Sequence, residues 1–273
     1  MRTDYPRPAK IRRFNLCGAM FYVLQSTTDP TLWKIVSDTC RDRWCIPCAR
    51  HRAATITANL LPLIQGKEIR MLTLTLQANA TSLRAQLDKL LASFSTLRRS
   101  AVWQQHISGG AAMIEITRGR NEDHWHPHLH ILVEGQFFPK QLLRAAWETA
   151  SGGSYIVDLR RVWDPESVVH YVTKYATKPA HASLWKDQNA LQEAMNALRG
   201  RKLLISFGTW QHFNLLTPPS TGEWTNYGHV FELDLKSRQG DLAASAILHY
   251  LTWDIHAAAG EPFYLNLAGD IPP

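Results

Sequence analysis

The sequence predicts an α+β protein built on one antiparallel sheet. Leucines alternate with threonines over residues 72–76, which is the period-two pattern of a strand with one buried face. Residues 113–117 and 128–133 are two further apolar stretches, and the polar connection between them predicts an antiparallel hairpin with a long loop. Another strand is expected over residues 155–159. Helices expected between these strands would pack against one face of the sheet.

The helices are predicted by periodicity and by the residues at their ends. Leucine and phenylalanine recur every three or four residues over 83–97, behind Thr81 and Ser82 as the two capping candidates. A second helix is expected over residues 139–147, with a proline at its start and a pair of glycines after its end. An Asp-Pro pair predicts the start of a third helix over residues 164–178.

Composition and pattern divide the chain into three expected domains. Residues 1–66 are rich in cysteine and arginine, and residues 67–210 contain the alternating strands and helices. Residues 211–273 form a C-terminal extension with no assigned role, where we expect a strand over 230–235 and a helix over 241–255. Four tryptophans are expected in the core rather than as platforms on which bases stack: Trp103, Trp147, Trp163 and Trp210.

Charge and hydropathy narrow the class of function. The chain is 45% hydrophobic and 19% charged, so a globular protein with a sizeable core is expected. Apolar runs fall short of the roughly 20 residues that span a bilayer, and the N-terminus lacks the apolar stretch of a signal peptide, so we expect a cytoplasmic protein. Lys and Arg outnumber Asp and Glu by 30 to 23, which favours a polyanionic partner such as nucleic acid and leaves an anionic membrane surface open.

One face of the predicted hairpin carries side chains that can bind a metal ion. His128 and His130 share a strand face, and Glu115 lies on the same face of the neighbouring strand. Two imidazoles and a carboxylate suit a divalent ion with positions open for substrate, and a phosphate substrate favours Mn²⁺ or Mg²⁺. We expect this face to be open, whereas the opposite face packs helices. The simpler interpretation is that the histidines are only polar surface residues.

The helix expected over residues 164–178 carries two tyrosines four residues apart, so both phenols lie on one helical face. Lys174 and Lys178 follow an adjoining stripe. A phenol with a pKa of about 10 needs a cation nearby to attack a phosphodiester at neutral pH. Tyr171 and Tyr175 are therefore candidate nucleophiles and Lys174 a candidate phosphate ligand, although aromatic residues at this spacing more often only pack in a core.

The order and spacing of these motifs resemble the HUH endonucleases, in particular the initiators of rolling-circle replication in small bacterial plasmids and single-stranded DNA phages. The resemblance rests on His-Pro-His-Leu-His-Ile at residues 126–131 and on Tyr-Val-Thr-Lys-Tyr at residues 171–175. It extends to three other stretches: residues 72–75, 115–118 and 155–161. It implies that His128, His130 and Glu115 bind the divalent ion.

The resemblance also implies a mechanism. Tyr175 would attack one DNA strand, leaving a 5′-phosphotyrosine link and a free 3′-hydroxyl for a host polymerase working with a helicase. Many initiators of this kind have a glutamate four residues before the nucleophile, where this chain has Tyr171. The departure resembles the subclass with two tyrosines, in which both can attack in successive strand transfers.

All four cysteines lie in the first expected domain: Cys17, Cys40, Cys45 and Cys48. Four thiolates can form a closed tetrahedral site for structural Zn²⁺, with His51 as a substitute ligand if Cys17 is too distant. Disulfides or a redox pair are the alternatives. The arginines beside the cysteines are expected to contact phosphates of single-stranded or hairpin origin DNA, as is Lys178. They are Arg41, Arg43, Arg50 and Arg52.

Three other functions compete with the initiator endonuclease. A single-strand DNA transposase with two tyrosines would use the same chemistry. A zinc-module DNA-binding regulator without enzymatic activity would explain the charge and the cysteines, but not the joint presence of histidines, carboxylate and tyrosines. The alternating histidines also resemble a histidine triad nucleotide hydrolase, which would leave the cysteines and the tyrosine helix unexplained.

Overall fold

The structure is a computed structural model, and contacts divide the chain into two compact units. We call residues 53–218 the central unit, and residues 1–52 together with 219–273 the terminal unit. These boundaries differ from the expected ones after residues 66 and 210, because the C-terminal residues pair with N-terminal strands. The structure describes residues 8–77, 79–118, 124–164, 167–169, 171, 173, 184, 186–217, 222–253 and 263–264.

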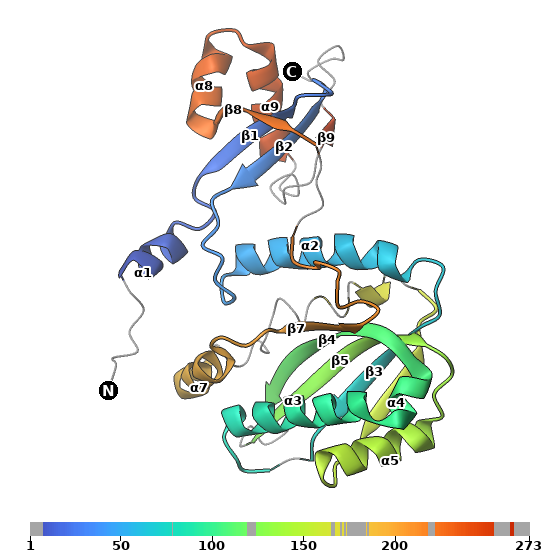
Figure 1. The fold of residues 1–273 in the computed structure, drawn as a ribbon. Helices are drawn as coiled ribbons and strands as arrows, with labels where there is room; N and C mark the ends of the chain where they lie inside the picture. The colour runs from blue at the N-terminus through green and yellow to red at the C-terminus, as the bar shows by residue number, and fades with distance from the viewer. Residues whose placement is uncertain are drawn as a thin grey trace. The chain divides into compact units, whose positions relative to one another are not determined.

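The central unit contains a five-stranded antiparallel sheet in the order β6-β3-β5-β4-β7 (Figure 1). Its strands are β3 (Ile69–Thr75), β4 (Ile107–Arg118), β5 (Trp125–Gly135), β6 (Val157–Arg161) and β7 (Leu204–Gly208). The predicted α+β class is confirmed, and β4 and β5 form the predicted antiparallel hairpin. The hairpin is longer than expected in both strands, since pairing begins at Ile107 and continues to Gly135.

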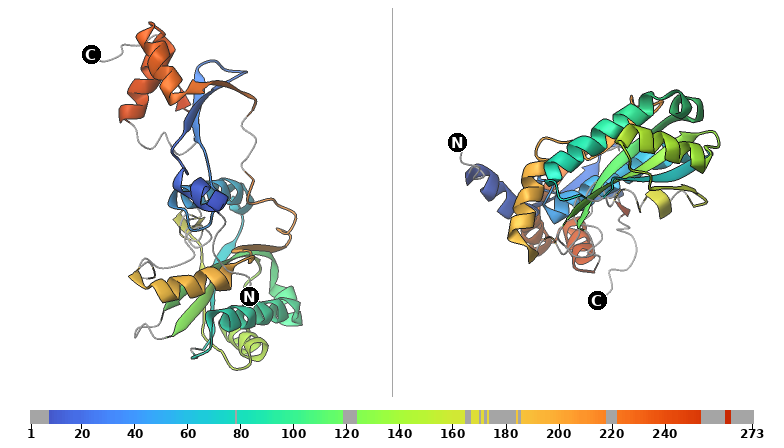
Figure 2. Two further views of the ribbon diagram at one scale, coloured as in Figure 1. Left: turned by 90° about the vertical axis from the view of Figure 1, so that its left-hand side faces the viewer. Right: turned by 90° about the horizontal axis from the view of Figure 1, so that it is seen from below.

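Three helices cover one face of this sheet: α3 (Leu83–Arg99), α4 (Ala101–His106) and α5 (Lys140–Ser151). Seen from below, α3 and α5 lie side by side across the strands (Figure 2). The predicted helix ends are confirmed. The Ser82 side chain accepts a hydrogen bond from the Ala85 amide, and Gly152 ends α5 with a positive φ of 69°. A further helix, α7 (Gln188–Leu198), packs against α3.

The opposite face of the sheet is partly covered, which corrects the expectation of an open face. Helix α2 (Ile46–Ile64) lies on that side (Figure 1), and its residues Ile56 and Leu60 join a buried apolar cluster with Met113 and Leu132. Met113 and Leu132 share a face with the histidines, but they lie toward the other end of the strands. Apolar side chains therefore close one end of this face, and the histidines occupy the other end.

The terminal unit contains a second sheet in the order β8-β1-β2-β9. Its strands are β1 (Phe21–Ser26), β2 (Leu32–Ser37), β8 (Trp224–His229) and β9 (Phe263–Tyr264). Its helices are α1 (Pro8–Asn15), α8 (Val230–Arg238) and α9 (Leu242–Trp253). A buried cluster joins Val23, Trp33 and Ile35 of the first strands to Leu233 and Ile247 of the last helices.

The C-terminal predictions had mixed outcomes. The helix expected over 241–255 is confirmed as α9 through Trp253. The strand expected over 230–235 is wrong, because the strand ends at His229 and a helix begins at Val230. His229 caps that helix through its side chain, and Glu232 bonds back to the His229 amide. The alternating apolar residues at this position therefore belong to a helix, which begins with a capping box.

Three of the four tryptophans expected in the core are there, since Trp103, Trp147 and Trp210 are at most 3% exposed. The fourth expectation is wrong, because Trp163 is 80% exposed. It lies two residues after the end of β6, and the guanidinium carbon of Arg161 lies 4.4 Å from the centre of its ring. None of the described helices is long and apolar enough to cross a membrane.

Candidate active site

The site begins with the histidines of β5, which project from one face of the central sheet. Antiparallel register places Glu115 of β4 directly opposite His128 and diagonally next to His130. The Nε2 atom of His130 lies 2.8 Å from the Oε2 atom of Glu115. His130 is 6% exposed, so this contact is largely screened from water. The structure thus brings together two of the three predicted metal ligands.

His128 points its ring nitrogens at two threonines. Its Nδ1 atom lies 3.0 Å from Thr75 Oγ1, and its Nε2 atom lies 3.2 Å from Thr117 Oγ1. Burial lowers the pKa of His128 to about 4, with a smaller lowering from the neighbouring His126. The ring is therefore neutral at neutral pH, which is the form that binds metal ions.

The ring nitrogens of His128 do not gather with the ligand atoms of His130 and Glu115 as they would around one metal ion. Within the described part of the chain, four cysteines form the one group of three or more metal-binding side chains whose ligand atoms all lie within 4.8 Å of one another. Glu115, His128 and His130 do not meet that criterion. The Nε2 atom of His128 would have to leave Thr117 to join the pair formed by His130 and Glu115.

The threonines of β3 complete the surroundings of the histidines. Thr73 pairs with His130 and Thr75 with His128 across the antiparallel ladder. The Oγ1 atom of Thr73 lies 3.3 Å from the Nδ1 atom of His130. The sequence analysis used these threonines to predict a strand and as part of the resemblance, without placing them in the site. The signal that could have found them is the alternation of leucine and threonine. Because side chains of a strand alternate between its two faces, both hydroxyls lie on one face, which is the face of the histidines.

Tyr171 lies beside this group. Its ring meets the ring of His130 edge to face, with centroids 6.2 Å apart and planes at 88°. The described residues 167–169, 171 and 173 are helical, Val169 joins the buried cluster under α2, and Thr173 is 2% exposed. The Oγ1 atoms of Thr173 and Thr57 are 3.3 Å apart. This stretch thus buries Val169 and Thr173 and turns the half-exposed Tyr171 toward His130. The other predicted residues of this helix lie outside the described residues: Lys174, Tyr175 and Lys178.

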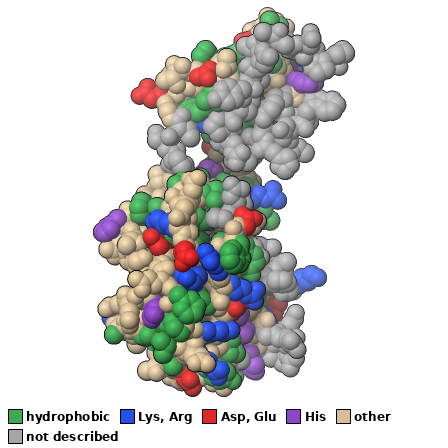
Figure 3. Space-filling view, turned by 90° about the vertical axis from the view of Figure 1, so that its right-hand side faces the viewer, with side chains coloured by type: hydrophobic (Ala, Val, Ile, Leu, Met, Phe, Trp, Pro, Cys, Tyr) green, Lys and Arg blue, Asp and Glu red, His purple; other side chains and the backbone are tan. Residues whose placement is uncertain are grey.

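An ion pair on β6 was not anticipated from the sequence. Asp158 pairs with Thr73, which itself pairs with His130, so the three residues lie in one row across the sheet. The Oδ2 atom of Asp158 lies 2.8 Å from Nε of Arg160. The hydrogen bond that Arg160 donates to Asp158 raises the pKa of Arg160, and the Tyr171 phenol group adds a smaller contribution in the same direction. Lys and Arg side chains gather over the central unit on the face that Figure 3 shows.

The cysteines of the terminal unit form a second candidate site. The sulfur of Cys17 lies 3.4 Å from those of Cys45 and Cys48, and the sulfurs of Cys40 and Cys48 are 3.6 Å apart. A tetrahedral zinc ion bound at about 2.3 Å separates its sulfur ligands by about 3.8 Å. The thiols are free rather than joined in disulfides. The group therefore fits Zn²⁺, and Cys17 is close enough that His51 is not needed as a ligand.

The backbone around the cysteines supports this arrangement. The amide of Cys40 donates to the sulfur of Cys17, and the amide of Asp42 donates to the sulfur of Cys40. Burial raises the pKa of the Cys45 thiol, which means that a thiolate there needs a nearby positive charge. A zinc ion would supply that charge.

The four arginines predicted to contact DNA all lie beside the cysteines in the terminal unit. Arg41 and Arg50 are exposed, whereas Arg43 and Arg52 are partly buried. Burial lowers the pKa of Arg43, and repulsion from Arg52 adds to this lowering. Cationic side chains held close together at the cost of mutual repulsion are consistent with a surface that binds an anion.

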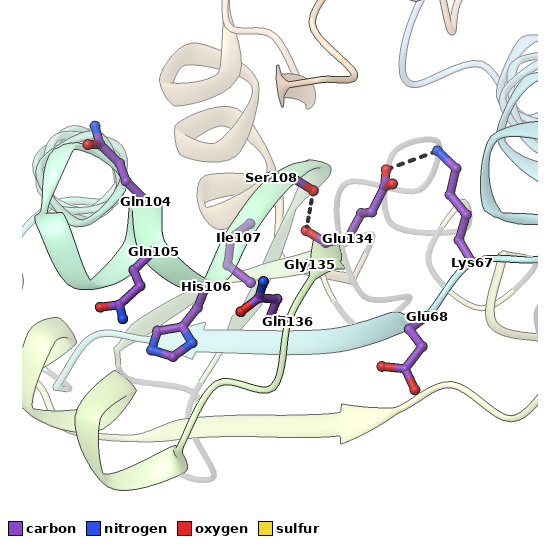
Figure 4. Close-up of a pocket in the computed structure, with 10 residues that line it drawn as sticks. All are labelled: Lys67, Glu68, Gln104, Gln105, His106, Ile107, Ser108, Glu134, Gly135 and Gln136. Atoms are coloured by element: carbon purple, nitrogen blue, oxygen red, sulfur yellow. Dashed lines mark hydrogen bonds and ion pairs between the residues drawn. The ribbon is translucent and has the colours of Figure 1, made fainter.

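A pocket of about 380 Å³ lies at the opposite end of β3, β4 and β5 from the histidines (Figure 4). Lys67 and Glu134 form an ion pair of 3.0 Å in its lining, and His106 and Glu68 also line it. Its lining contains no residue of the predicted site and mixes positive and negative charges. The pocket therefore does not mark the histidine site.

Comparisons with known proteins place the chain in a family. The model of the Rep_1 family, described as a replication protein, matches residues 35–221. A protein rep of Streptococcus pneumoniae serotype 2 is 23% identical over 176 residues, which are 61% of this chain and 52% of that protein. A protein rep of Bacillus amyloliquefaciens is 29% identical over 139 residues, which are 45% of this chain and 41% of that protein.

A protein rep of a Bacillus species is 28% identical over 139 residues, or 45% of each chain. The chain thus spans about half the length of the curated relatives that it matches. No solved structure was found to match it. Because the family model covers well over half of the sequence, the chain belongs to the Rep_1 family of replication proteins.

Proposed function

We propose that this protein is a replication initiator endonuclease that nicks and rejoins single-stranded DNA at an origin through a 5′-phosphotyrosine intermediate. The observation that carries the proposal is the position of Tyr171. Its phenol ring lies against His130, whose Nε2 atom is 2.8 Å from Glu115. A nucleophile candidate thus lies beside two candidate metal ligands in a protein of a replication family.

His128, His130 and Glu115 would hold Mn²⁺ or Mg²⁺. Adjacent ligands bound at about 2.1 Å and at right angles are separated by about 3 Å, and His130 and Glu115 already have a similar separation. Two imidazoles and a carboxylate leave positions open for phosphate oxygens and water. When bound, the ion would neutralise charge on the non-bridging oxygens of the scissile phosphate.

The tyrosines would carry out the strand transfer. The phenol oxygen of Tyr175 attacks the phosphorus, the bond from phosphorus to the 3′-oxygen breaks, and the proton passes to that oxygen. Rejoining reverses the step, since a 3′-hydroxyl attacks the phosphotyrosine and releases the phenol. The ester keeps the bond energy, so the cycle needs no nucleotide. Tyr171 would serve as the second nucleophile and Lys174 as a phosphate ligand.

The terminal unit would bind the origin DNA. Zn²⁺ held by the four cysteines would order the segment from Cys17 to Cys48, and Arg41, Arg43, Arg50 and Arg52 would contact phosphates. Lys178 would add a phosphate contact near the nucleophile. Contacts of this kind position DNA without reading its sequence, and their affinity falls as salt concentration rises.

Covalent adduct formation tests the proposal. Protein and labelled single-stranded or hairpin origin oligonucleotides are incubated with Mn²⁺, and label that remains with the protein is measured on a denaturing gel. We expect an adduct that EDTA abolishes and that Tyr175→Phe removes or reduces at least tenfold. Loss only in the variant with both tyrosines replaced would show that either can attack. Binding of origin DNA without any adduct would instead support the regulator without enzymatic activity.

A further inference from the structure

We propose that Thr73 and Thr75 are positioning residues that hold the Nδ1 atoms of His130 and His128 and let each ring change tautomer when a divalent cation binds at Nε2. This inference rests on the metal site of the proposed function. It assigns a chemical role to the β3 strand, which contributes no ligand itself.

The geometry is the same at both rings. Thr73 is the register partner of His130, and Thr75 is the register partner of His128. The distances from threonine Oγ1 to histidine Nδ1 are 3.3 Å and 3.0 Å. Because the side-chain period of a strand is two, one alternating motif on β3 matches two alternating histidines on β5. The hydroxyls thus meet Nδ1 of each ring, whereas Nε2 contacts Glu115 in His130 and Thr117 in His128.

The neighbours of His128 determine which nitrogen of its neutral ring carries the proton. The Thr117 hydroxyl donates to the His126 carbonyl at 2.8 Å, so its oxygen can only accept from Nε2 of His128. Nε2 therefore carries the proton in the neutral ring. Nδ1 then has a lone pair, and the Thr75 hydroxyl donates to it.

His130 has the same proton arrangement for a different reason. Its Nε2 atom faces the Glu115 carboxylate at 2.8 Å, and an ionised carboxylate can only accept. In the neutral ring the proton is therefore on Nε2, and the Thr73 hydroxyl donates to Nδ1. In its neutral form, each ring therefore holds its proton at the nitrogen that a metal ion would need.

Cation binding requires the opposite tautomer. To bind a divalent cation, Nε2 would need a free lone pair, so it would lose its proton to water and Nδ1 would take up a proton from water. Each ring stays neutral. The new Nδ1 donor then needs an acceptor, and the same threonine hydroxyl can rotate and accept. A carbonyl could serve only the metal-bound state, whereas a hydroxyl serves both.

Burial makes this property of the hydroxyl important. Thr75 is 5% exposed and His130 is 6% exposed, so water is a poor substitute partner for either ring. Threonine is also common in strands because of its shape alone. Valine has the same shape and strand preference but lacks the hydroxyl, so replacing threonine with valine separates the two roles.

The experiment compares Thr73→Val, Thr75→Val and the double variant with Thr73→Ser and Thr75→Ser. Thr225→Val, on β8 of the terminal unit, is the matched control. Calorimetry measures Mn²⁺ affinity of the full chain loaded with Zn²⁺, and a His128→Ala, His130→Ala variant identifies the signal of this site. Nitrogen NMR of the histidine rings reports tautomers before and after addition of Mg²⁺, which is diamagnetic.

We expect each valine variant to bind Mn²⁺ about 10 to 100 times more weakly, as loss of an outer partner of a metal-bound histidine typically does. The serine variants and the control should stay near wild type. In wild type the ring proton should move from Nε2 to Nδ1 on addition of Mg²⁺. Valine variants with unchanged Mn²⁺ affinity, or rings protonated at Nδ1 before metal is added, would overturn this inference but not the proposed metal site. Wild type that binds no Mn²⁺ would overturn both the inference and the proposed metal site.

Discussion

His130 and Glu115 are joined by a contact of 2.8 Å although they are 15 residues apart in the sequence. The contact is diagonal across the β4–β5 hairpin, since Glu115 is the register partner of His128 and Met113 is the register partner of His130. On the side of His130 away from Glu115, β3 contributes Thr73. His130 of this pair thus contacts both the Thr73 hydroxyl and the ring of Tyr171.

Replacing Glu115 tests this pair. We expect Glu115→Gln to lower Mn²⁺ affinity and the rate of adduct formation at least tenfold, because an amide oxygen carries no charge to offset that of the ion. Calorimetry and the denaturing gel measure the two effects. The control is Glu148→Gln, an exposed position on α5. If Glu115→Gln formed adducts at the wild-type rate, Glu115 would not be a metal ligand.

Removal of zinc should unfold the segment around the cysteines. We expect about one Zn²⁺ per chain in wild type and none in Cys48→Ser, with a lower melting temperature, because metal binding contributes directly to the folding of such sites. Emission spectroscopy measures the metal content, and calorimetric scans measure the melting temperature. Ser237→Ala is a control that retains all four thiols. Retention of zinc by Cys48→Ser would exclude Cys48 as a ligand.

The terminal unit should lose stability in acid through Asp241. Hydrogen bonds from Tyr227 and from the Ala244 amide lower the pKa of Asp241 below its ordinary value of 3.8. A carboxylate with a lowered pKa contributes stability that is fully present above pH 3.8 and is lost as the pH falls through the folded-state pKa. Burial raises the pKa of Tyr227 to about 12, and the hydrogen bond to the Asp241 carboxylate adds to this rise. The Tyr227 phenol therefore remains a donor throughout this pH range.

Tyr227→Phe tests this link, since it removes a hydrogen bond of 2.7 Å. We expect the free energy of unfolding at pH 7 to fall by about 0.5 to 1.5 kcal/mol. We also expect a weaker pH dependence below pH 4, measured as urea unfolding at several pH values. Tyr155→Phe, which changes an exposed phenol of the central unit, is the control. Identical pH profiles for Tyr227→Phe and wild type would contradict the assignment.

Trp163 is expected to stack on a base of single-stranded DNA. The ring is 80% exposed, lies two residues after the end of β6, and contacts the guanidinium of Arg161. Because stacking of one base on an aromatic ring contributes about 1 to 3 kcal/mol, Trp163→Ala should weaken oligonucleotide binding by about 5 to 150 times. Fluorescence anisotropy measures the affinity. Trp163→Phe should retain most of it, and an unchanged affinity of Trp163→Ala would show that the ring does not contact DNA.

Local patterns predicted most of the central unit correctly. Alternation identified β3 and the β4–β5 hairpin, and Ser82 and Gly152 marked helix ends, because these signals depend only on neighbouring residues. The same kind of reasoning failed at residues 230–235, where alternating apolar residues belong to a helix. It also failed at Trp163, because burial depends on residues distant in the chain.

The sequence by itself determined which chemistry is available: alternating histidines, a carboxylate on the neighbouring strand, four cysteines and a pair of tyrosines. The fold decided how these groups meet. Strand register joined Glu115 to His130 and put a threonine against each imidazole, and the chain termini paired into a unit that composition could not reveal. Register and pairing are set by packing between segments far apart in the sequence, and no local pattern contains that information.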